Sequence, residues 1–252
     1  MTKPKLVIFD MGNTLLNFHA GIHTDDEKDL LGLGYMSEYL LSQFAVEISP
    51  ETLETCFLKP WLEDFYIREQ GLELDVTCYI NPFLTEYKIR FTEKNYVNLM
   101  SEFYRAYREE VVVSKNAKEI LKNLHENGVK IAVASNCILF DEIYESIFRE
   151  QGLSQYIDKF FFSYSRGIRK PDRRLFEEII AHFNFEPNEI ILVGDSLKAD
   201  ITPAKALGMK TIWLNRKNLC SENEVADVEI KAFEDLLPYF SRSCFKNLFL
   251  KL

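Results

Sequence analysis

The stretch "LVIFDMGNTLLNF" (residues 6–18) decides the fold of this chain. Four apolar residues, Leu6 to Phe9, lead directly into Asp10. A short apolar run that ends in turn-forming residues is typical of a strand buried inside a sheet. A buried carboxylate is costly unless a partner compensates its charge. Asp10 therefore predicts a polar site at the end of this strand.

Similar apolar runs recur later in the chain and alternate with helical patterns. The predicted strands are residues 6–10, 130–135, 190–195 and 210–215, with 160–164 as a further candidate. The predicted helices between them are residues 116–128, 172–184 and 200–209. Apolar strands that alternate with helices indicate an α/β fold, a Rossmann-like parallel sheet with helices on both faces.

The segment between the first strand and residue 110 has a different pattern. It contains no comparable strand, and its apolar residues recur at helical spacing, with Ser49 and Thr92 at predicted helix N-caps. We therefore expect a core made of residues 1–16 and 111–252, with an all-α cap, residues 17–110, inserted after the first strand. The sheet is expected to resume near Val113, and residues 239–252 are expected to form a helix on the core.

Composition excludes several classes of protein. The formal net charge of -9 over 252 residues repels polyanions, so nucleic acid is not an expected partner, although a local cationic site for a small anion remains open. Five scattered cysteines predict neither a disulfide framework nor a zinc site and fit a reducing cytoplasm: Cys56, Cys78, Cys137, Cys220 and Cys244. No run reaches the roughly 18 apolar residues of a membrane span. We expect a cytoplasmic protein without a membrane partner, and the oligomeric state stays open.

Polar residues interrupt the apolar pattern where strands or their following loops end. They are Asp10, Ser135, Asn136, Lys170, Asp195 and Asp200. Asp200 is also expected to open the helix of residues 200–209. Because the carboxyl ends of parallel strands share one edge of the sheet, we expect these side chains to meet in one pocket.

Taken singly, each of these residues has an ordinary interpretation as a turn or helix-cap residue. Their joint occurrence, in order and at strand ends, favours a common site. Three carboxylates would repel one another unless a cation lies among them. Oxygen ligands of this kind suit Mg²⁺, which binds a few carboxylates together with water and substrate phosphate. The pattern predicts a magnesium-dependent phosphate site.

The segments "FDMGNTL", "VASN", "RKPD" and "GDSLKAD" together resemble the four motifs of the haloacid dehalogenase superfamily of phosphohydrolases. The spacing from the first to the second motif resembles the subgroup with a helical cap after the first strand, and the resemblance covers nearly the whole chain. It implies a phosphatase that acts on a small phosphorylated metabolite through an aspartyl-phosphate intermediate.

The resemblance also implies roles for single residues. Asp10 would attack phosphorus, and Ser135, with backbone N–H groups around Asn136, would hold the phosphoryl oxygens. Lys170 would neutralise charge on Asp10 and on the transferring group.

The metal ligands follow from the same resemblance. Mg²⁺ would be bound by Asp10, by Asp195 and by the backbone carbonyl of Gly12. Asp200 would either bind the metal as an additional ligand or orient the ligands without contacting the metal itself.

Gly12 departs from the phosphatase pattern, in which this position usually carries a second aspartate as general acid. Losing a general acid typically costs about 10²–10⁴-fold in rate. Three interpretations stay open. The substrate can be an acyl, anomeric or aryl phosphate whose leaving group scarcely needs a proton. The cap or the substrate can supply the proton, with His19 and His23 as weak candidates. Or the protein binds phosphorylated ligands with little turnover.

Hydrolytic dehalogenation is the alternative chemistry, because it also starts from a nucleophilic aspartate. It needs neither a general acid nor a metal, and it would leave Asp195 and Asp200 harder to explain. The metal-dependent hypothesis is therefore favoured.

The cap carries no motif that identifies a substrate. Its aromatic and basic residues are interpreted as helix packing and solvated charge rather than as pocket walls: Tyr35, Trp61, Phe65, Tyr66, Tyr79, Phe83, Arg68 and Arg90.

Overall fold

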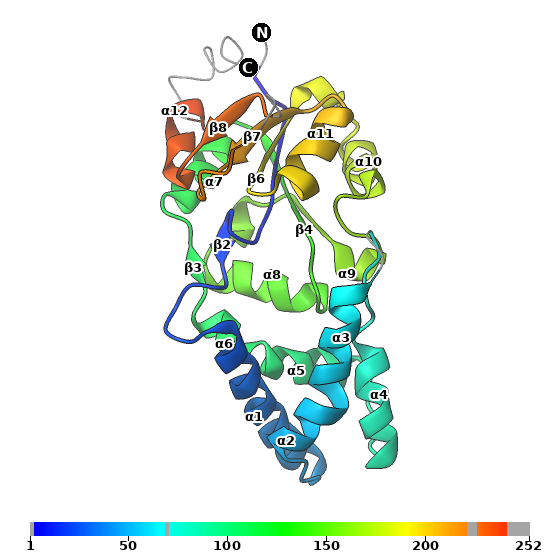
Figure 1. Ribbon diagram of the computed structural model, residues 1–252. Helices are drawn as coiled ribbons and strands as arrows, with labels where there is room; N and C mark the ends of the chain where they lie inside the picture. The colour runs from blue at the N-terminus through cyan, green and yellow to red at the C-terminus, as the bar shows by residue number, and fades with distance from the viewer. Residues whose placement is uncertain (1–2, 69–70, 221–225, 241–252) are drawn as a thin grey trace.

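Six parallel strands form the main sheet of the protein, in the order β5–β4–β1–β6–β7–β8 (Figure 1). The computed structural model describes residues 3–68, 71–220 and 226–240. The strands are β1 (Leu6–Phe9), β4 (Lys130–Ser135), β5 (Lys159–Phe162), β6 (Ile190–Gly194), β7 (Lys210–Leu214) and β8 (Val228–Ile230). The predicted strands are confirmed to within a residue or two, and only the edge strand β8 was not expected.

The first strand lies in the middle of the sheet. Leu6 is in register with Lys130 of β4 on one side and with Ile190 of β6 on the other. In the same way, Phe9 lies beside both Val133 and Val193. The carboxyl ends of these three strands are therefore level, and the residues that follow them are neighbours.

Side chains of β1 alternate between two apolar layers, as the pleat of a strand requires. Val7 and Phe9 belong to the larger layer, which includes Leu121 of α7 (Ala117–Glu126). Ile8 belongs to the other layer, which includes Phe176 of α10 (Arg173–Phe183). Both faces of the sheet are covered, and the predicted α/β fold class is confirmed.

The other helices around the sheet are short, except for α8 (Asp141–Glu150). The short ones are α9 (Ser163–Arg166), α11 (Thr202–Ala206), α12 (Leu237–Phe240), the 3-10 turns η2 (Ser154–Tyr156), η3 (Pro187–Glu189) and η5 (Phe233–Leu236), and the π-helical turn η4 (Leu197–Ile201). Helix α8 was not predicted. In Figure 1 it lies between the sheet and the helices that precede residue 110 in the chain.

The helices within the described residues 25–68 and 71–109 extend away from the sheet (Figure 1). The helices are α1 (Asp25–Phe44), α2 (Pro50–Leu53), the π-helical turn η1 (Glu54–Leu58), α3 (Lys59–Ile67), α4 (Thr77–Glu86), α5 (Glu93–Phe103) and α6 (Arg105–Glu109). The side chains of Ser49 and Thr92 cap α2 and α5, as predicted. A Cβ at Gly32 would lie 2.3 Å from the carbonyl oxygen of Phe103, so glycine lets α1 and α5 pack closely.

The chain enters and leaves this helical segment through a short antiparallel ribbon of β2 (Leu16–Asn17) and β3 (Val112–Val113). The expectation that the main sheet resumes near Val113 is wrong, because Val113 pairs with Leu16 and the main sheet resumes at β4. The predicted C-terminal helix lies mostly outside the described residues, which end at Phe240. None of the described helices is both long and apolar enough to cross a membrane.

Candidate active site

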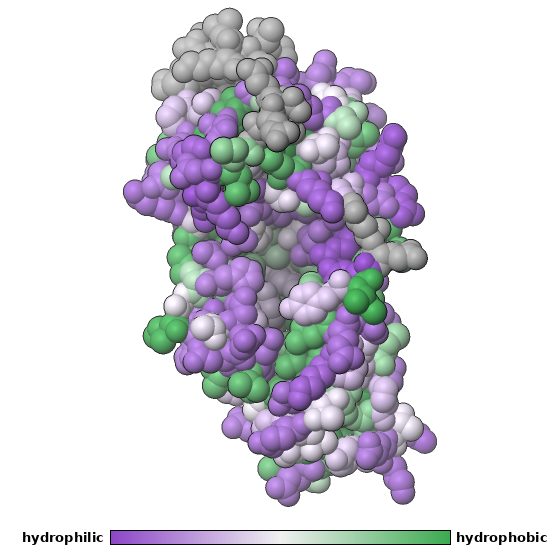
Figure 2. Space-filling model, in the orientation of Figure 1, coloured by the Kyte–Doolittle hydropathy of each residue, from purple (hydrophilic) through white to green (hydrophobic). Residues whose placement is uncertain are grey.

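The site lies where the sheet ends and faces the helical segment. Asp10, Ser135 and Asp195 end or follow the adjacent strands β1, β4 and β6. The backbone N–H of Asp10 donates to the carbonyl of Val193 at 2.9 Å, which extends the β1–β6 ladder by one residue. The surface of the protein is hollowed between the sheet and the helical segment (Figure 2).

Lys170 connects the polar side chains of the site. Its ammonium donates to Asp10 Oδ1 at 2.7 Å, to Asp200 Oδ1 at 2.6 Å and to the carbonyl of Ala134 at 2.9 Å. Only 4% of Lys170 is exposed. Burial alone would lower the pKa of Lys170, but Asp10 and Asp200 raise it above the usual value for lysine. Lys170 is therefore a fixed positive charge at neutral pH.

The backbone of Lys170 is held by the side chain of Asn136. Asn136 Oδ1 accepts from the Lys170 N–H at 2.7 Å, and Asn136 Nδ2 donates to the Lys170 carbonyl at 2.9 Å. The sequence suggested only backbone groups near Asn136 as functional, so this positioning contact was missed. Ser135 is buried beside it, and its hydroxyl lies 3.5 Å from the Asn136 carbonyl, which is long for a hydrogen bond.

Three carboxylates meet next to this lysine. Asp10, Asp195 and Asp200 each offer an oxygen within 4.8 Å of the others. Asp10 Oδ2 is buried and has no hydrogen-bond partner among the described residues. Burial and the nearby Asp10 raise the pKa of Asp195 to about 6. A buried carboxylate oxygen without a donor, set among further carboxylates, fits a hard cation such as Mg²⁺.

Both oxygens of Asp200 contact protein donors. Oδ1 accepts from Lys170, and Oδ2 accepts from the backbone N–H of Ser196 at 3.1 Å. Burial raises the pKa of the Asp200 carboxyl, against the opposing charge of Lys170. A Cβ at Gly194 would lie 2.6 Å from this carboxylate, so glycine leaves the room that Asp200 occupies.

Asp200 does not open a helix, contrary to the expectation from sequence. It lies within η4, and Ser196 is the N-cap, with its hydroxyl accepting from the N–H of Ala199 at 3.1 Å. The reason is that the helical turn already begins at Ser196, so that Asp200 lies inside it, with its buried carboxylate between Lys170 and the backbone N–H of Ser196.

Gly12 lies in the turn after β1. A Cβ at this position would have no atom within 4 Å, and its φ lies outside the left-handed region. The neighbouring Asn13 takes the positive φ of the turn, 57°. Neither packing nor backbone geometry therefore requires glycine at position 12.

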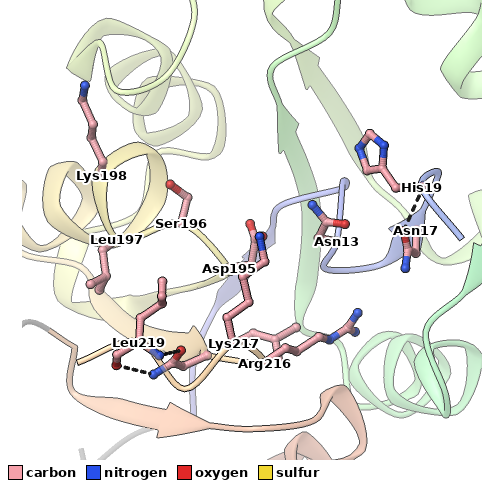
Figure 3. Close-up of a pocket in the computed structure, with 12 residues that line it drawn as sticks. Asn13, Asn17, His19, Asp195, Ser196, Leu197, Lys198, Arg216, Lys217 and Leu219 are labelled. Carbon is pink, nitrogen blue, oxygen red and sulfur yellow. Dashed lines mark hydrogen bonds between the residues drawn. The ribbon is translucent and has the colours of Figure 1, made fainter. Parts of the chain in front are cut away.

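A cavity of about 690 Å³ opens beside Asp195 (Figure 3). Its lining includes Asn13, Asn17, His19, Asp195, Ser196, Lys198, Arg216 and Lys217. In Figure 3, Asn13, Asn17 and His19 lie on one side of Asp195, and Ser196 and Lys198 lie on the other. His19 Nδ1 lies 2.8 Å from Asp25, whereas His23 Nδ1 lies 2.5 Å from Glu110. His19 and His23 were the two histidines considered as proton donors from the sequence. His19 is among the residues that line this cavity.

A second cavity, of about 290 Å³, opens beside Lys170. Its lining includes Phe65, Arg68, Arg169, Lys170, Ser196 and Lys198. Ser196 and Lys198 line both cavities. The interpretation of Phe65 and Arg68 as packing and solvated charge is therefore wrong, because the turn at the end of α3 brings them to the sheet edge. It holds for Trp61 and Phe83, which are buried among helices, and for Arg90, which is exposed.

Comparison with known proteins agrees with this geometry. The family model of haloacid dehalogenase-like hydrolases matches residues 4–208. A ribulose-1,5-bisphosphate 5-phosphatase of Halopiger xanaduensis is 34% identical over 50% of this chain, so the match spans about half (52%) of that relative. A pyrimidine 5′-nucleotidase of Streptococcus pneumoniae is 24% identical over 97% of this chain and 98% of its own length.

The fold is shared with solved structures. A haloacid dehalogenase-type phosphatase from Thermococcus onnurineus superposes with a TM-score of 0.60 at 23% identity, covering 94% of this chain and 99% of that one. The four motifs thus lie on the expected fold and meet at one edge of its sheet, and the family model covers most of the chain. This protein belongs to the haloacid dehalogenase-like hydrolases.

Proposed function

We propose that this protein is a magnesium-dependent phosphatase that hydrolyses a small phosphorylated metabolite through a covalent intermediate on Asp10. One observation carries the proposal. Lys170 bridges Asp10 and Asp200, while the second oxygen of Asp10 is buried without a donor and next to Asp195. This leaves one oxygen of Asp10 available to a cation or to an electrophile.

The reaction has two steps. A carboxylate oxygen of Asp10 forms a bond to phosphorus while the ester P–O bond breaks, and the alcohol leaves. Water then attacks the same phosphorus, the bond to Asp10 breaks, and inorganic phosphate is released. The buried ammonium of Lys170 stabilises negative charge in both steps, and the hydroxyl of Ser135 donates to a phosphoryl oxygen.

The metal would be held by Asp10, Asp195 and the carbonyl of Gly12. When bound, Mg²⁺ would neutralise charge on the phosphate and on the clustered carboxylates. Asp200 is assigned the supporting role, because both of its oxygens already contact Lys170 and Ser196.

The mechanism must also account for the proton that an alcohol leaving group needs. The space where a side chain at position 12 would lie is empty in the described structure, so no acid comes from there. We favour a leaving group that needs little proton assistance. His19 is the better second source, because it lines the cavity beside Asp195. Both histidines are paired with a carboxylate, His19 with Asp25 and His23 with Glu110.

We further propose that residues 17–110 act as the cap. The two chain crossings through β2 and β3 connect it to the core. Its helix α3 brings Phe65 and Arg68 to the cavity beside Lys170, so this segment contributes directly to the site. Substrate choice would then depend on the cap.

Two matches support a phosphate ester as substrate, since the names of both curated relatives give phosphate-releasing enzymes. Dehalogenases share this fold: a solved dehalogenase superposes with a TM-score of 0.59 at 20% identity over 96% of this chain and 99% of that one. Fold alone does not separate the two reactions. The carboxylate cluster favours the phosphatase, because in a metal-free site the single ammonium of Lys170 would face three carboxylates and would compensate their mutual repulsion only in part.

A screen of phosphorylated metabolites with Mg²⁺, and again with excess chelator, tests the proposal. We expect phosphate release that needs Mg²⁺ and is lost in Asp10→Asn. Halide release from a 2-haloacid in the presence of chelator would instead establish the dehalogenase. Tight binding of phosphorylated ligands without any turnover would establish a binding protein.

A further inference from the structure

The cavity beside Lys170 is unusually basic for a protein with a formal net charge of -9. Arg68, Arg169, Lys170 and Lys198 line it, and the lining residues that the structure describes include no acidic side chain. Lys170 is bound to Asp10 and Asp200, and Arg169 is paired with Glu73 at 3.2 Å. Two of the four cations, Arg68 and Lys198, therefore remain to be explained.

Arg68 is held in place without a close ion pair among the described residues, although the charge of Glu73 acts on it from farther away. Its guanidinium lies 3.6 Å from the centre of the Phe65 ring, and Nη1 donates to the Phe65 carbonyl at 2.6 Å. No carboxylate oxygen of the described residues lies within 4 Å of it. Partial burial lowers the pKa of Arg68. A half-buried, oriented guanidinium that lacks an anion is poorly compensated, and an anionic ligand would remove that cost.

Phe65 fixes the direction of this group. Its ring lies near two guanidinium groups, that of Arg68 and, 5.8 Å from its centre, that of Arg169. Because a guanidinium stacked on a ring presents its N–H groups edge-on, the remaining donors of Arg68 are available in the plane of the guanidinium. Arg169 is held by Glu73, whose side chain is 2% exposed. Both guanidinium groups near this ring are thus held by contacts within the protein, Arg68 by Phe65 and Arg169 by Glu73.

Lys198 completes the cavity from the core. It lies on η4, two residues before Asp200, and it lines both this cavity and the one beside Asp195. It is exposed, and none of the described carboxylates lies within 4 Å of its ammonium. Arg68 from the helical segment and Lys198 from the core thus border one small volume next to the proposed phosphate site.

We propose that Arg68 and Lys198 bind a second anionic group of the substrate, a carboxylate or a second phosphate. This rests on the proposed function, in which Lys170 and Asp10 bind the phosphate that is cleaved. The substrate class is then a small phosphate monoester with another negative charge a few bonds away. Arg68 supplies paired N–H donors and Lys198 supplies a point charge.

Two ligands with matched skeletons test this inference: glycerol 3-phosphate and 3-phosphoglycerate, which carries a carboxylate in place of an alcohol. Each is measured in the presence of Mg²⁺ as a competitive inhibitor of p-nitrophenyl phosphate hydrolysis. We expect 3-phosphoglycerate to bind about 10- to 100-fold more tightly, the range of one or two charged hydrogen bonds. Glycerol bisphosphate tests a second phosphate in the same way.

Arg68→Gln should reduce this ratio to about threefold or less, and Lys198→Met should reduce it in part. Arg90→Gln is the matched control, because Arg90 is an exposed arginine of the same helical segment, and it should keep the full ratio. A ratio near one in the parent protein would overturn the inference, as would a folded Arg68→Gln variant that keeps the ratio.

Calorimetric titration of the same ligands separates this inference from the proposed function. If no phosphate ester is hydrolysed, the proposed function fails, but the affinity ratio and its dependence on Arg68 still decide whether the second anion site exists. If hydrolysis is found and the ratio is one, only the second anion site fails.

Discussion

Two lysines are buried among the described residues, and their charges are compensated by different kinds of partner. Lys170, at the sheet edge, contacts the carboxylates of Asp10 and Asp200. Lys28, near the start of α1, is fully buried and donates to the carbonyls of Phe18 and Ala20, each at 2.9 Å. The nearest carboxylate to Lys28 is that of Glu110, at 3.4 Å.

The difference lies in what each ammonium organises. The partners of Lys170 are side chains from distant strands and loops, so it sets the electrostatics of a reactive site. The main partners of Lys28 are backbone groups of the linker after β2, so it fixes the path of the chain. Glu110 helps at the return crossing, because it also accepts from the backbone N–H groups of Ile22 and His23. Lys170 thus belongs to the proposed catalytic site, whereas Lys28 connects the two segments through which the chain enters and leaves the helical segment.

The largest expected effect is at the carboxylate that Lys170 contacts. Asp10→Asn keeps the shape of the side chain but removes the nucleophile, so turnover should fall by about 10³-fold or more. The fold should stay intact, as checked by circular dichroism and thermal unfolding. Activity of purified, contaminant-free Asp10→Asn within a few-fold of the parent would disprove the covalent mechanism.

Metal removal should come next. Chelation should abolish phosphate release, and Asp195→Ala should reduce it by about a hundredfold or more at any Mg²⁺ concentration, because a ligand carboxylate is lost. Magnesium titration of activity measures this effect. Asp26→Ala, at an exposed position of α1, is the control and should behave as the parent. Full activity in excess chelator would favour the dehalogenase reaction.

Lys28→Met tests the structural role of the second buried lysine. Methionine fills similar space but leaves the carbonyls of Phe18 and Ala20 without donors, so the free energy of unfolding should fall by about 2–3 kcal/mol. Turnover per folded molecule should stay the same. Urea unfolding measures the loss, and Lys94→Met, on the exposed face of α5, is the control. An unchanged unfolding midpoint would show that the junction does not depend on this lysine.

Gly12→Asp asks whether the missing acid limits the reaction. Because a Cβ at position 12 meets no atom within 4 Å, the variant should fold and bind Mg²⁺. Aryl phosphates should be good substrates of the parent and alkyl phosphates poor ones, since an alkoxide leaves only with a proton. The alkyl-to-aryl rate ratio should then rise about tenfold or more. Gly12→Ala is the control for the backbone, and an unmoved ratio would mean that the proton comes from elsewhere.

The smallest expected effect concerns Asp29, beside Lys28. Burial raises the pKa of Asp29 to about 6, although Tyr107 donates to it at 2.9 Å. A carboxyl whose pKa is raised on folding destabilises the protein once it ionises, as the pH rises from about 4 to about 6. Asp29→Asn should therefore add about 1 kcal/mol to the free energy of unfolding at pH 7 and nothing near pH 4. Chemical unfolding at the two pH values decides, and an equal gain at both would refute the electrostatic cause.

The same contrast shows what the sequence could reveal. Lys170 was found because it stands in a motif, after a predicted strand, with carboxylates at the ends of other strands. Lys28 was not found, because a lysine in the polar first turns of a helix normally faces solvent. Its burial depends on where the linker folds back, which involves residues about 80 positions away in sequence, such as Glu110.

Within the site, the sequence predicted which residues meet but not their contacts. Parallel register makes the ends of β1, β4 and β6 level, so proximity followed from strand position alone. The bonds from Asn136 to the Lys170 backbone depend on loop conformation, and so does the burial of Asp200 inside η4. Phe65 and Arg68 reach the site only through the orientation of α3, and no local pattern encodes that orientation.

The central place of β1 also shapes how the protein is made. β1 precedes both of its neighbours in the sheet by more than 100 residues, because these strands begin at Lys130 and Ile190. Until those residues have been synthesised, the strand that carries Asp10 has no sheet partner and is an unpaired apolar edge. Long-range pairing of this kind is slow, because a large loop must close first. Asp10 is thus synthesised well before the strands that pair with β1, and the site around it assembles only after both of them are complete.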